Sequence, residues 1–64
     1  MKLKNRYIKY KNIIGRLDLN PYFITNRYKY NLVIMIDKKA FRFLSYCNTK
    51  KEAQEIIKEN YKYL

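Results

Sequence analysis

The C-terminal part of the chain shows the clearest alternation of apolar and charged positions. Its apolar residues recur with the spacing that lines one face of a helix: Ala53, Ile56, Ile57, Tyr61 and Leu64. Glutamates and lysines fill the opposite face. Thr49 and Glu52 have the spacing of a capping box, in which each side chain bonds a backbone amide at the helix start. We therefore predict an amphipathic helix over about residues 50–62, with its apolar face in the core.

Two segments ahead of this helix predict a β-hairpin. Residues 28–36 and 40–46 are rich in the β-branched and aromatic side chains that favour strands. The intervening Asp37-Lys38-Lys39 is the only turn-like interruption. Both faces of this hairpin carry apolar residues, so we expect something to cover part of the face turned away from the helix. Because helix–sheet packing buries only one face, the other face is available for a ligand.

The register of the hairpin depends on the length of its loop. A loop of two or four residues would put Ile34 opposite Phe43 and leave Arg42 on the face that carries Val33. A loop of three residues would move Arg42 to the other face. The sequence leaves these alternatives open.

An earlier strand is predicted over about residues 6–14, where Gly15 is expected to end or kink it. Asn20-Pro21 marks a turn, and residues 22–24 form either a short strand or a loop under the sheet. We predict an α+β fold for residues 1–64, a single basic domain. It has a small antiparallel sheet of three strands, or four if residues 22–24 add one, and one C-terminal α-helix packed on one face.

The chemistry-bearing residues argue against several functions. One cysteine, Cys47, and the absence of histidine argue against a disulfide framework and a zinc site. No nucleophile, base and orienting group form a recognisable pattern, so we expect no catalysis, no cofactor and no small-molecule substrate. We interpret Cys47 as a small apolar filler at a strand end.

The longest apolar run, Leu32 to Ile36, is far shorter than the roughly 20 residues of a membrane span. Since the basic N-terminus also lacks the apolar stretch of a signal peptide, we expect a cytoplasmic protein without a membrane partner.

Charge narrows the choice of partner. Fifteen Lys and Arg against five Asp and Glu give a net charge of +10. Residues 52–64 carry a net charge of −1, so the positive charge is confined to the part of the chain before the helix. Residues 6–11 and 27–30 interleave Lys and Arg with Tyr, whose rings can stack on bases. This pattern favours a polyanion as partner, with nucleic acid ahead of membrane.

Residues 30–53 resemble the hairpin and helix of two related families, the ethylene-response-factor-type DNA-binding domain and the N-terminal arm-binding domain of tyrosine recombinases. The shared features are a strand, a short basic turn, a second strand that ends near Leu44-Ser45-Tyr46, and a Thr-x-x-Glu-Ala helix start at Thr49. In those families a three-stranded sheet enters the DNA major groove and the helix braces its back. The resemblance implies DNA contact by strand residues, here Arg6, Lys9, Lys11, Arg27, Lys29 and Arg42.

The leading hypothesis is a non-catalytic nucleic-acid-binding protein that binds duplex DNA through the basic, tyrosine-rich face of its sheet. The predicted contact residues are Lys2, Lys4, Arg6, Tyr7, Lys9, Tyr10, Lys11, Arg16, Arg27, Tyr28, Lys29, Tyr30, Lys38, Lys39 and Arg42. The abundance of Lys, Tyr, Ile and Asn, which have AT-rich codons, suggests a low-GC genome. The small size then fits a bacterium, a phage or another mobile element, and we favour a phage or mobile element. The protein would then be an accessory or regulatory factor in the host cytoplasm.

Two alternatives stay open at this point. The first is a small phage-type inhibitor, similar to an anti-CRISPR protein, that binds a host nucleoprotein complex through the apolar residues Val33, Met35 and Leu44. The second is a single-stranded RNA-binding protein that stacks bases on its tyrosines.

Overall fold

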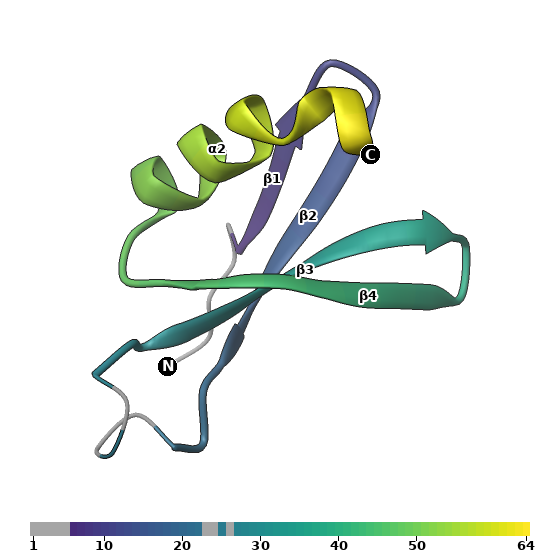
Figure 1. Ribbon diagram of the computed structural model, residues 1–64. Helices are drawn as coiled ribbons and strands as arrows, with labels where there is room; N and C mark the ends of the chain where they lie inside the picture. The colour runs from purple at the N-terminus through teal and green to yellow at the C-terminus, as the bar shows by residue number, and fades with distance from the viewer. Residues whose placement is uncertain (1–5, 23–24, 26) are drawn as a thin grey trace.

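The protein folds as a four-stranded antiparallel sheet with one α-helix packed against it (Figure 1). This computed structural model describes residues 6–22, 25 and 27–64. The elements in chain order are β1 (Tyr7–Tyr10), β2 (Ile13–Leu19), β3 (Tyr30–Asp37), β4 (Ala40–Cys47), α2 (Lys50–Glu59) and the 3₁₀ helix η1 (Tyr61–Tyr63). Strands that follow one another in the chain are neighbours in the sheet, in the order β1-β2-β3-β4. The predicted α+β fold with one C-terminal helix is confirmed.

The predicted strand over residues 6–14 is wrong in its boundaries, because the chain reverses at Lys11 and Asn12. These two residues form a tight turn between β1 and β2, and Lys11 adopts a φ of 54°. Gly15 therefore lies inside β2, where it pairs with Ile8 and Ile34. A Lys-Asn pair is a weaker hairpin signal than Asn-Gly, so the sequence pattern read as one continuous strand. The fourth strand comes from this split, and residues 23–24 of the alternative strand lie outside the described residues.

The β3–β4 hairpin has a two-residue turn, yet its pairing differs from the expected one. Asp37 pairs with Ala40, but Met35 pairs with Phe41, so Ile36 is an extra residue on β3. This bulge shifts the register by one. Ile34 consequently lies opposite Arg42. The pair of Ile34 with Phe43, which was the alternative for a loop of two or four residues, is therefore wrong, although the loop has two residues. Phe41 and Phe43 move to the face of the sheet that carries Val33, and Arg42 moves to the face that carries Ile34.

Helix α2 begins where the sequence predicted. Thr49 is its N-cap residue, and the Thr49 hydroxyl oxygen accepts a hydrogen bond from the backbone N–H of Glu52 at 3.0 Å. The Glu52 carboxylate reaches back and accepts from the N–H of Asn48 at 2.7 Å. The helix ends at Glu59, and η1 continues the chain over the predicted last turn.

The core lies between α2 and one face of the sheet. Its buried residues are Ile8, Leu17, Leu32, Ile34, Cys47, Ala53 and Ile57. Helix and sheet approach closely at Gly15, where an added Cβ would lie 3.1 Å from the Ile57 side chain and 3.2 Å from that of Leu32. The glycine therefore serves the packing of α2 on β2, and does not end a strand.

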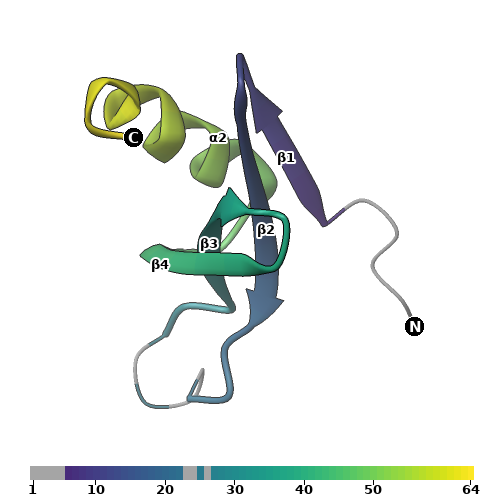
Figure 2. The ribbon, with the colours of Figure 1, turned by 90° about the vertical axis from the view of Figure 1, so that its right-hand side faces the viewer.

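Helix α2 covers only one side of the sheet. Figure 2 shows α2 on one side of β2, and no other described element covers the opposite side. We call this opposite side the outer face.

Candidate nucleic-acid interface

Cross-strand pairing defines which side chains form the outer face. Tyr7 pairs with Arg16, Arg16 with Val33, and Val33 with Phe43, so one row of residues crosses all four strands. A second row contains Asp18, Asn31 and Tyr46. Because successive residues of a strand point to opposite faces, these rows alternate with the buried core positions. The outer face thus combines aromatic, aliphatic and charged side chains.

Arg16, near the centre of this face, is held by its neighbours. Its guanidinium donates two hydrogen bonds to the Asp18 carboxylate, at 2.7 and 2.9 Å. It also lies over the Phe41 ring, 4.1 Å from the ring centroid. The hydrogen bond with Asp18 raises the pKa of Arg16 above its ordinary value. Arg16 was predicted to contact phosphate. In this arrangement its guanidinium is already paired with the Asp18 carboxylate.

Three aromatic side chains gather at one end of the outer face, and we call Tyr28, Phe43 and Tyr46 the aromatic cluster. The Tyr28 and Tyr46 rings stack with centroids 5.7 Å apart and an interplanar angle of 18°. Phe43 meets Tyr46 edge to face at 5.1 Å. The three residues are 41%, 50% and 42% exposed in chain order. Large aromatic side chains that stay this exposed are typical of binding surfaces.

Two asparagines hold the peptide group that joins Tyr28 to Lys29. The buried Asn20 donates from its amide to the Tyr28 carbonyl at 2.8 Å and accepts from the Tyr22 N–H at 3.0 Å. The Asn48 side chain accepts from the Lys29 N–H at 2.9 Å. The predicted turn at Asn20-Pro21 therefore has a further role, since Asn20 closes the loop and positions Tyr28.

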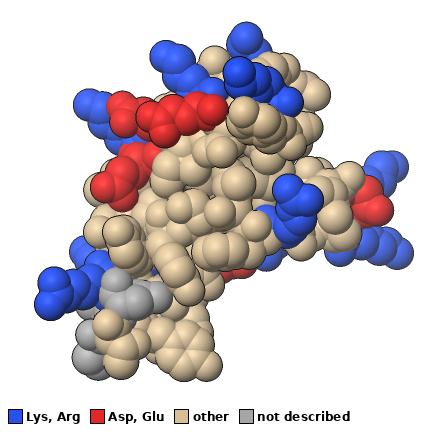
Figure 3. Space-filling model, viewed as in Figure 1, with Lys and Arg blue, Asp and Glu red and all other residues tan. Residues whose placement is uncertain are grey.

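The predicted cations do not share one face. Lys9 lies on the outer face, beside Tyr7, while Arg27 and Lys29 lie in the loop that precedes β3. Lys38 and Lys39 form the β3–β4 turn. Figure 3 shows basic side chains at several separate projections of one side of the molecule, with acidic side chains along α2. Arg6 precedes β1, and Lys2 and Lys4 lie outside the described residues.

Tyr10, Lys11 and Tyr30 make contacts with other side chains of the protein. The Tyr10 ring meets Tyr61 edge to face at 5.6 Å, and the Lys11 ammonium lies 5.0 Å from the Tyr61 ring centroid. The Tyr61 hydroxyl also donates to the Asn12 side chain at 2.8 Å. These contacts join the C-terminal turn to the β1–β2 turn. Tyr30 packs against the core.

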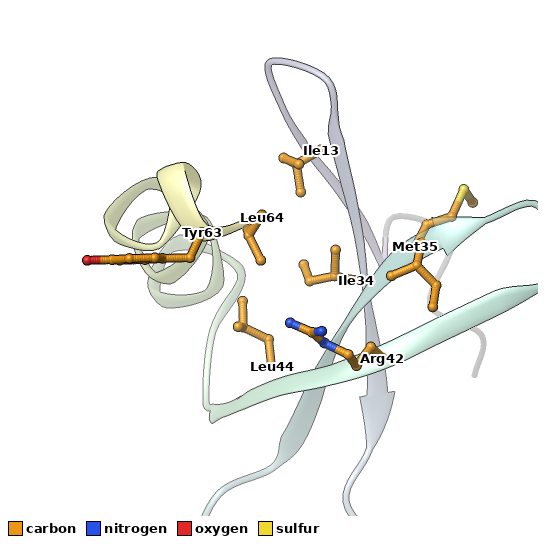
Figure 4. A pocket seen from close by; sticks show the side chains of 8 residues that line it. Ile13, Ile34, Met35, Arg42, Leu44, Tyr63 and Leu64 are labelled. Carbon is orange, nitrogen blue, oxygen red and sulfur yellow. The ribbon is translucent and has the colours of Figure 1, made fainter.

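Arg42 and Leu44 line a pocket on the helix side of the sheet. Arg42 faces this side because of the bulge at Ile36, and Leu44 is itself the extra residue of a second bulge, between the pairs Val33–Phe43 and Leu32–Ser45. Its volume is about 250 Å³. Figure 4 shows the Arg42 guanidinium pointing into the space between Ile34, Leu44 and Leu64. Of the predicted apolar interface, Val33 lies on the outer face, Met35 pairs with Phe41 and also lines this pocket, and Leu44 lies on the helix side.

Cys47 is fully buried, as expected for an apolar filler at a strand end. Burial raises the pKa of its thiol to about 11, with a smaller contribution from the Glu52 carboxylate.

Within the described residues, no group of three or more His, Cys, Asp or Glu side chains is placed to hold a metal ion. Nor do the described ranges contain a helix with the length and apolar character that membrane crossing requires.

Phe41, Phe43 and Tyr46 are the outer-face aromatics that the sequence prediction missed as candidate contacts. The residues were recognised as strand formers, but one of the two alternatives, a loop of two or four residues, put Phe41 and Phe43 on the face of Ile34, which packs against the helix. Only the bulge at Ile36 reverses their orientation. A bulge carries no strong signal in a segment without glycine, so the pattern alone offered no means to find them.

The chain matches no protein-family model, no curated protein and no solved structure. The resemblance of residues 30–53 to the two DNA-binding families therefore stays a prediction, and any function must be argued from the outer face itself.

Proposed function

We propose that this protein is a non-catalytic nucleic-acid-binding module and that the outer face of its sheet is the binding surface. The observation that carries the proposal is an uncovered sheet face with exposed aromatic side chains on a chain of net charge +10. Aromatic rings provide stacking surfaces, and cations neutralise phosphates. The combination is the one that a nucleic acid requires from a protein surface.

The cations support this proposal although they are dispersed. A net charge of +10 on 64 residues attracts a polyanion from any direction. Close phosphate contacts would then come from cations near the aromatic side chains, namely Lys9 beside Tyr7 and Arg27 and Lys29 beside Tyr28. Arg16 contributes less, because Asp18 neutralises it.

The setting we propose is the cytoplasm of a host cell, where the protein would be an accessory or regulatory factor of a phage or mobile element. Duplex DNA is the partner that the resemblance of residues 30–53 implies. In that case the sheet would lie in the major groove, which is roughly 12 Å wide.

A salt titration tests the proposal. Fluorescence anisotropy with labelled random-sequence duplex and single-stranded oligonucleotides would be measured between 50 and 200 mM salt, conditions under which phosphate contacts lose affinity. If about six phosphates of a duplex are neutralised, the logarithm of affinity falls with the logarithm of salt at a slope near −5. A slope near zero, or no binding at the lowest salt, would contradict the proposal.

A second candidate function is inhibition of a host nucleoprotein enzyme through protein contacts. It is favoured by the apolar part of the outer face, where Val33 lies beside Phe43, which is 50% exposed. Such a complex would persist after nuclease treatment, and Phe43→Asp would abolish it. Binding that disappears on nuclease digestion of the partner would argue for the first function.

A further inference from the structure

The aromatic cluster is built to present ring faces to a ligand. Tyr28, Phe43 and Tyr46 each keep between 41% and 50% of their surface exposed, although they contact one another. Beyond their contacts within the cluster, Phe43 and Tyr46 keep 50% and 42% of their surface exposed to solvent. Planar surfaces of this size match the faces of nucleobases.

We propose that the aromatic cluster is a stacking site for unpaired bases, and that single-stranded nucleic acid is the preferred ligand. This inference rests on the proposed nucleic-acid-binding function and specifies its substrate class, with single strands in place of the duplex DNA that the resemblance of residues 30–53 implies. Base faces are hidden in the helical stack of a duplex, whereas a single strand exposes them to aromatic side chains.

Charge distinguishes this ligand from an apolar protein partner. Arg27 and Lys29 flank Tyr28 in the chain, and both are exposed. The one acidic side chain identified on the outer face, that of Asp18, is neutralised by Arg16. The surroundings of the cluster are therefore cationic, which suits a base attached to a phosphate backbone.

The cluster is also ordered before any ligand arrives. Asn20 bonds the Tyr28 carbonyl, and Asn48 bonds the next backbone amide along the chain. The Tyr46 and Phe43 side chains extend from β4, a strand paired along its length with β3. A ligand thus meets rings in fixed positions, and little ordering entropy opposes binding.

The test compares ligands that carry equal numbers of phosphates. A single-stranded thymidine oligomer, an abasic oligomer of the same length and a duplex of half that length would be titrated into the protein at low salt. We expect the thymidine oligomer to bind at least about tenfold more tightly than the abasic oligomer, because the two differ only in stacking bases. The duplex is expected to bind more weakly than the thymidine oligomer.

Variants then assign the effect to the cluster. Phe43→Ala and Tyr46→Ala should each weaken binding of the thymidine oligomer by roughly 5- to 150-fold and leave the abasic oligomer unaffected. Phe43→Tyr, which keeps the ring, should retain affinity. Tyr63→Ala is the matched control, because Tyr63 is 74% exposed but lies in η1, by the pocket on the helix side. Quenching of a 2-aminopurine base by the unaltered protein gives a readout that needs no variant.

Two outcomes separate the inference from the proposed function. Equal affinity for the thymidine and abasic oligomers, with no 2-aminopurine quenching, would overturn the stacking site and leave nucleic-acid binding intact. Failure of all three ligands to bind would overturn both.

Discussion

Asp18 controls how much positive charge the outer face can offer. Its carboxylate accepts two hydrogen bonds from the Arg16 guanidinium, and the guanidinium also lies over the ring of Phe41. The pair keeps Arg16 in a fixed position against the sheet, but it also cancels a cation near the centre of the proposed binding surface. Removal of this one carboxylate should therefore increase affinity for nucleic acid.

The prediction compares Asp18→Asn with Asp37→Asn. Both changes raise the net charge by one, but Asp37 lies at the β3–β4 turn. We expect Asp18→Asn to tighten oligonucleotide binding about three- to fivefold at low salt, from a Coulomb energy of about 1 kcal/mol, and Asp37→Asn to have a smaller effect. Anisotropy titrations measure both variants. Equal effects would mean that the outer face is not the binding surface.

Cys47 gives the fold a dependence on alkaline pH. Burial raises the pKa of its thiol to about 11, whereas an exposed thiol in the unfolded chain ionises near 9. The folded state therefore binds the thiol proton more tightly, and the stability that this contributes is present below pH 9 and is lost as the pH rises toward 11.

Urea unfolding of the protein and of Cys47→Ala tests this dependence. Between pH 8 and pH 10.5 the unaltered protein should lose roughly 2 kcal/mol more unfolding free energy than the variant. Tyrosine and lysine titration is common to both proteins and cancels in the comparison. Parallel pH profiles would show that the thiol ionises equally well in the folded state.

At the scale of elements, the approach of α2 to β2 depends on Gly15. A Cβ at this position would meet the tips of the Ile57 and Leu32 side chains at 3.1 and 3.2 Å, which is closer than ordinary contact. The neighbouring side chains can move only a little to make room for the added Cβ, because protein interiors are close-packed.

Gly15→Ala should therefore destabilise the protein by about 1–3 kcal/mol, measured by urea or thermal unfolding. Ile57→Val, which removes the closest methyl group, should by itself lower the free energy of unfolding by about 0.5–1.5 kcal/mol. The double variant should be less destabilised than the sum of the two, since the second change creates room for the first. Strict additivity would show that the Cβ does not meet Ile57.

At the scale of the whole molecule, charge affects stability and binding in opposite directions. Fifteen basic residues on a 64-residue chain repel one another, and only a small core opposes that repulsion. Salt screens the repulsion and should stabilise the fold, while it weakens contacts with phosphate.

Thermal unfolding in 20 and 200 mM NaCl measures this effect. If the screening of this repulsion by salt raises the free energy of unfolding by about 1 kcal/mol, the Tm should rise by roughly 4–8 °C. The same increase in salt should reduce affinity for oligonucleotides. A Tm that falls with salt would mean that ion pairs such as Arg16–Asp18 outweigh the general repulsion.

Local patterns in the sequence were enough to predict the class of fold and its best-defined helix. Apolar spacing and the Thr49–Glu52 capping box depend only on residues within a few positions of one another, and both are confirmed. The two-residue turn at Lys38 and Lys39 was among the predicted alternatives for similar reasons.

Tertiary structure decided which side chains meet on the outer face. The reversal at Lys11, the bulge at Ile36 and the loop closed by Asn20 are set by the pairing of whole strands and by packing against the core, and not by a turn residue that marks them in the sequence. The extra residue Ile36 shifts the register by one until the extra residue Leu44 restores it. Within this interval the shift turned Phe41 and Phe43 away from the helix. Composition alone established the charge, whereas the arrangement of exposed rings depended on register, which a local pattern cannot fix.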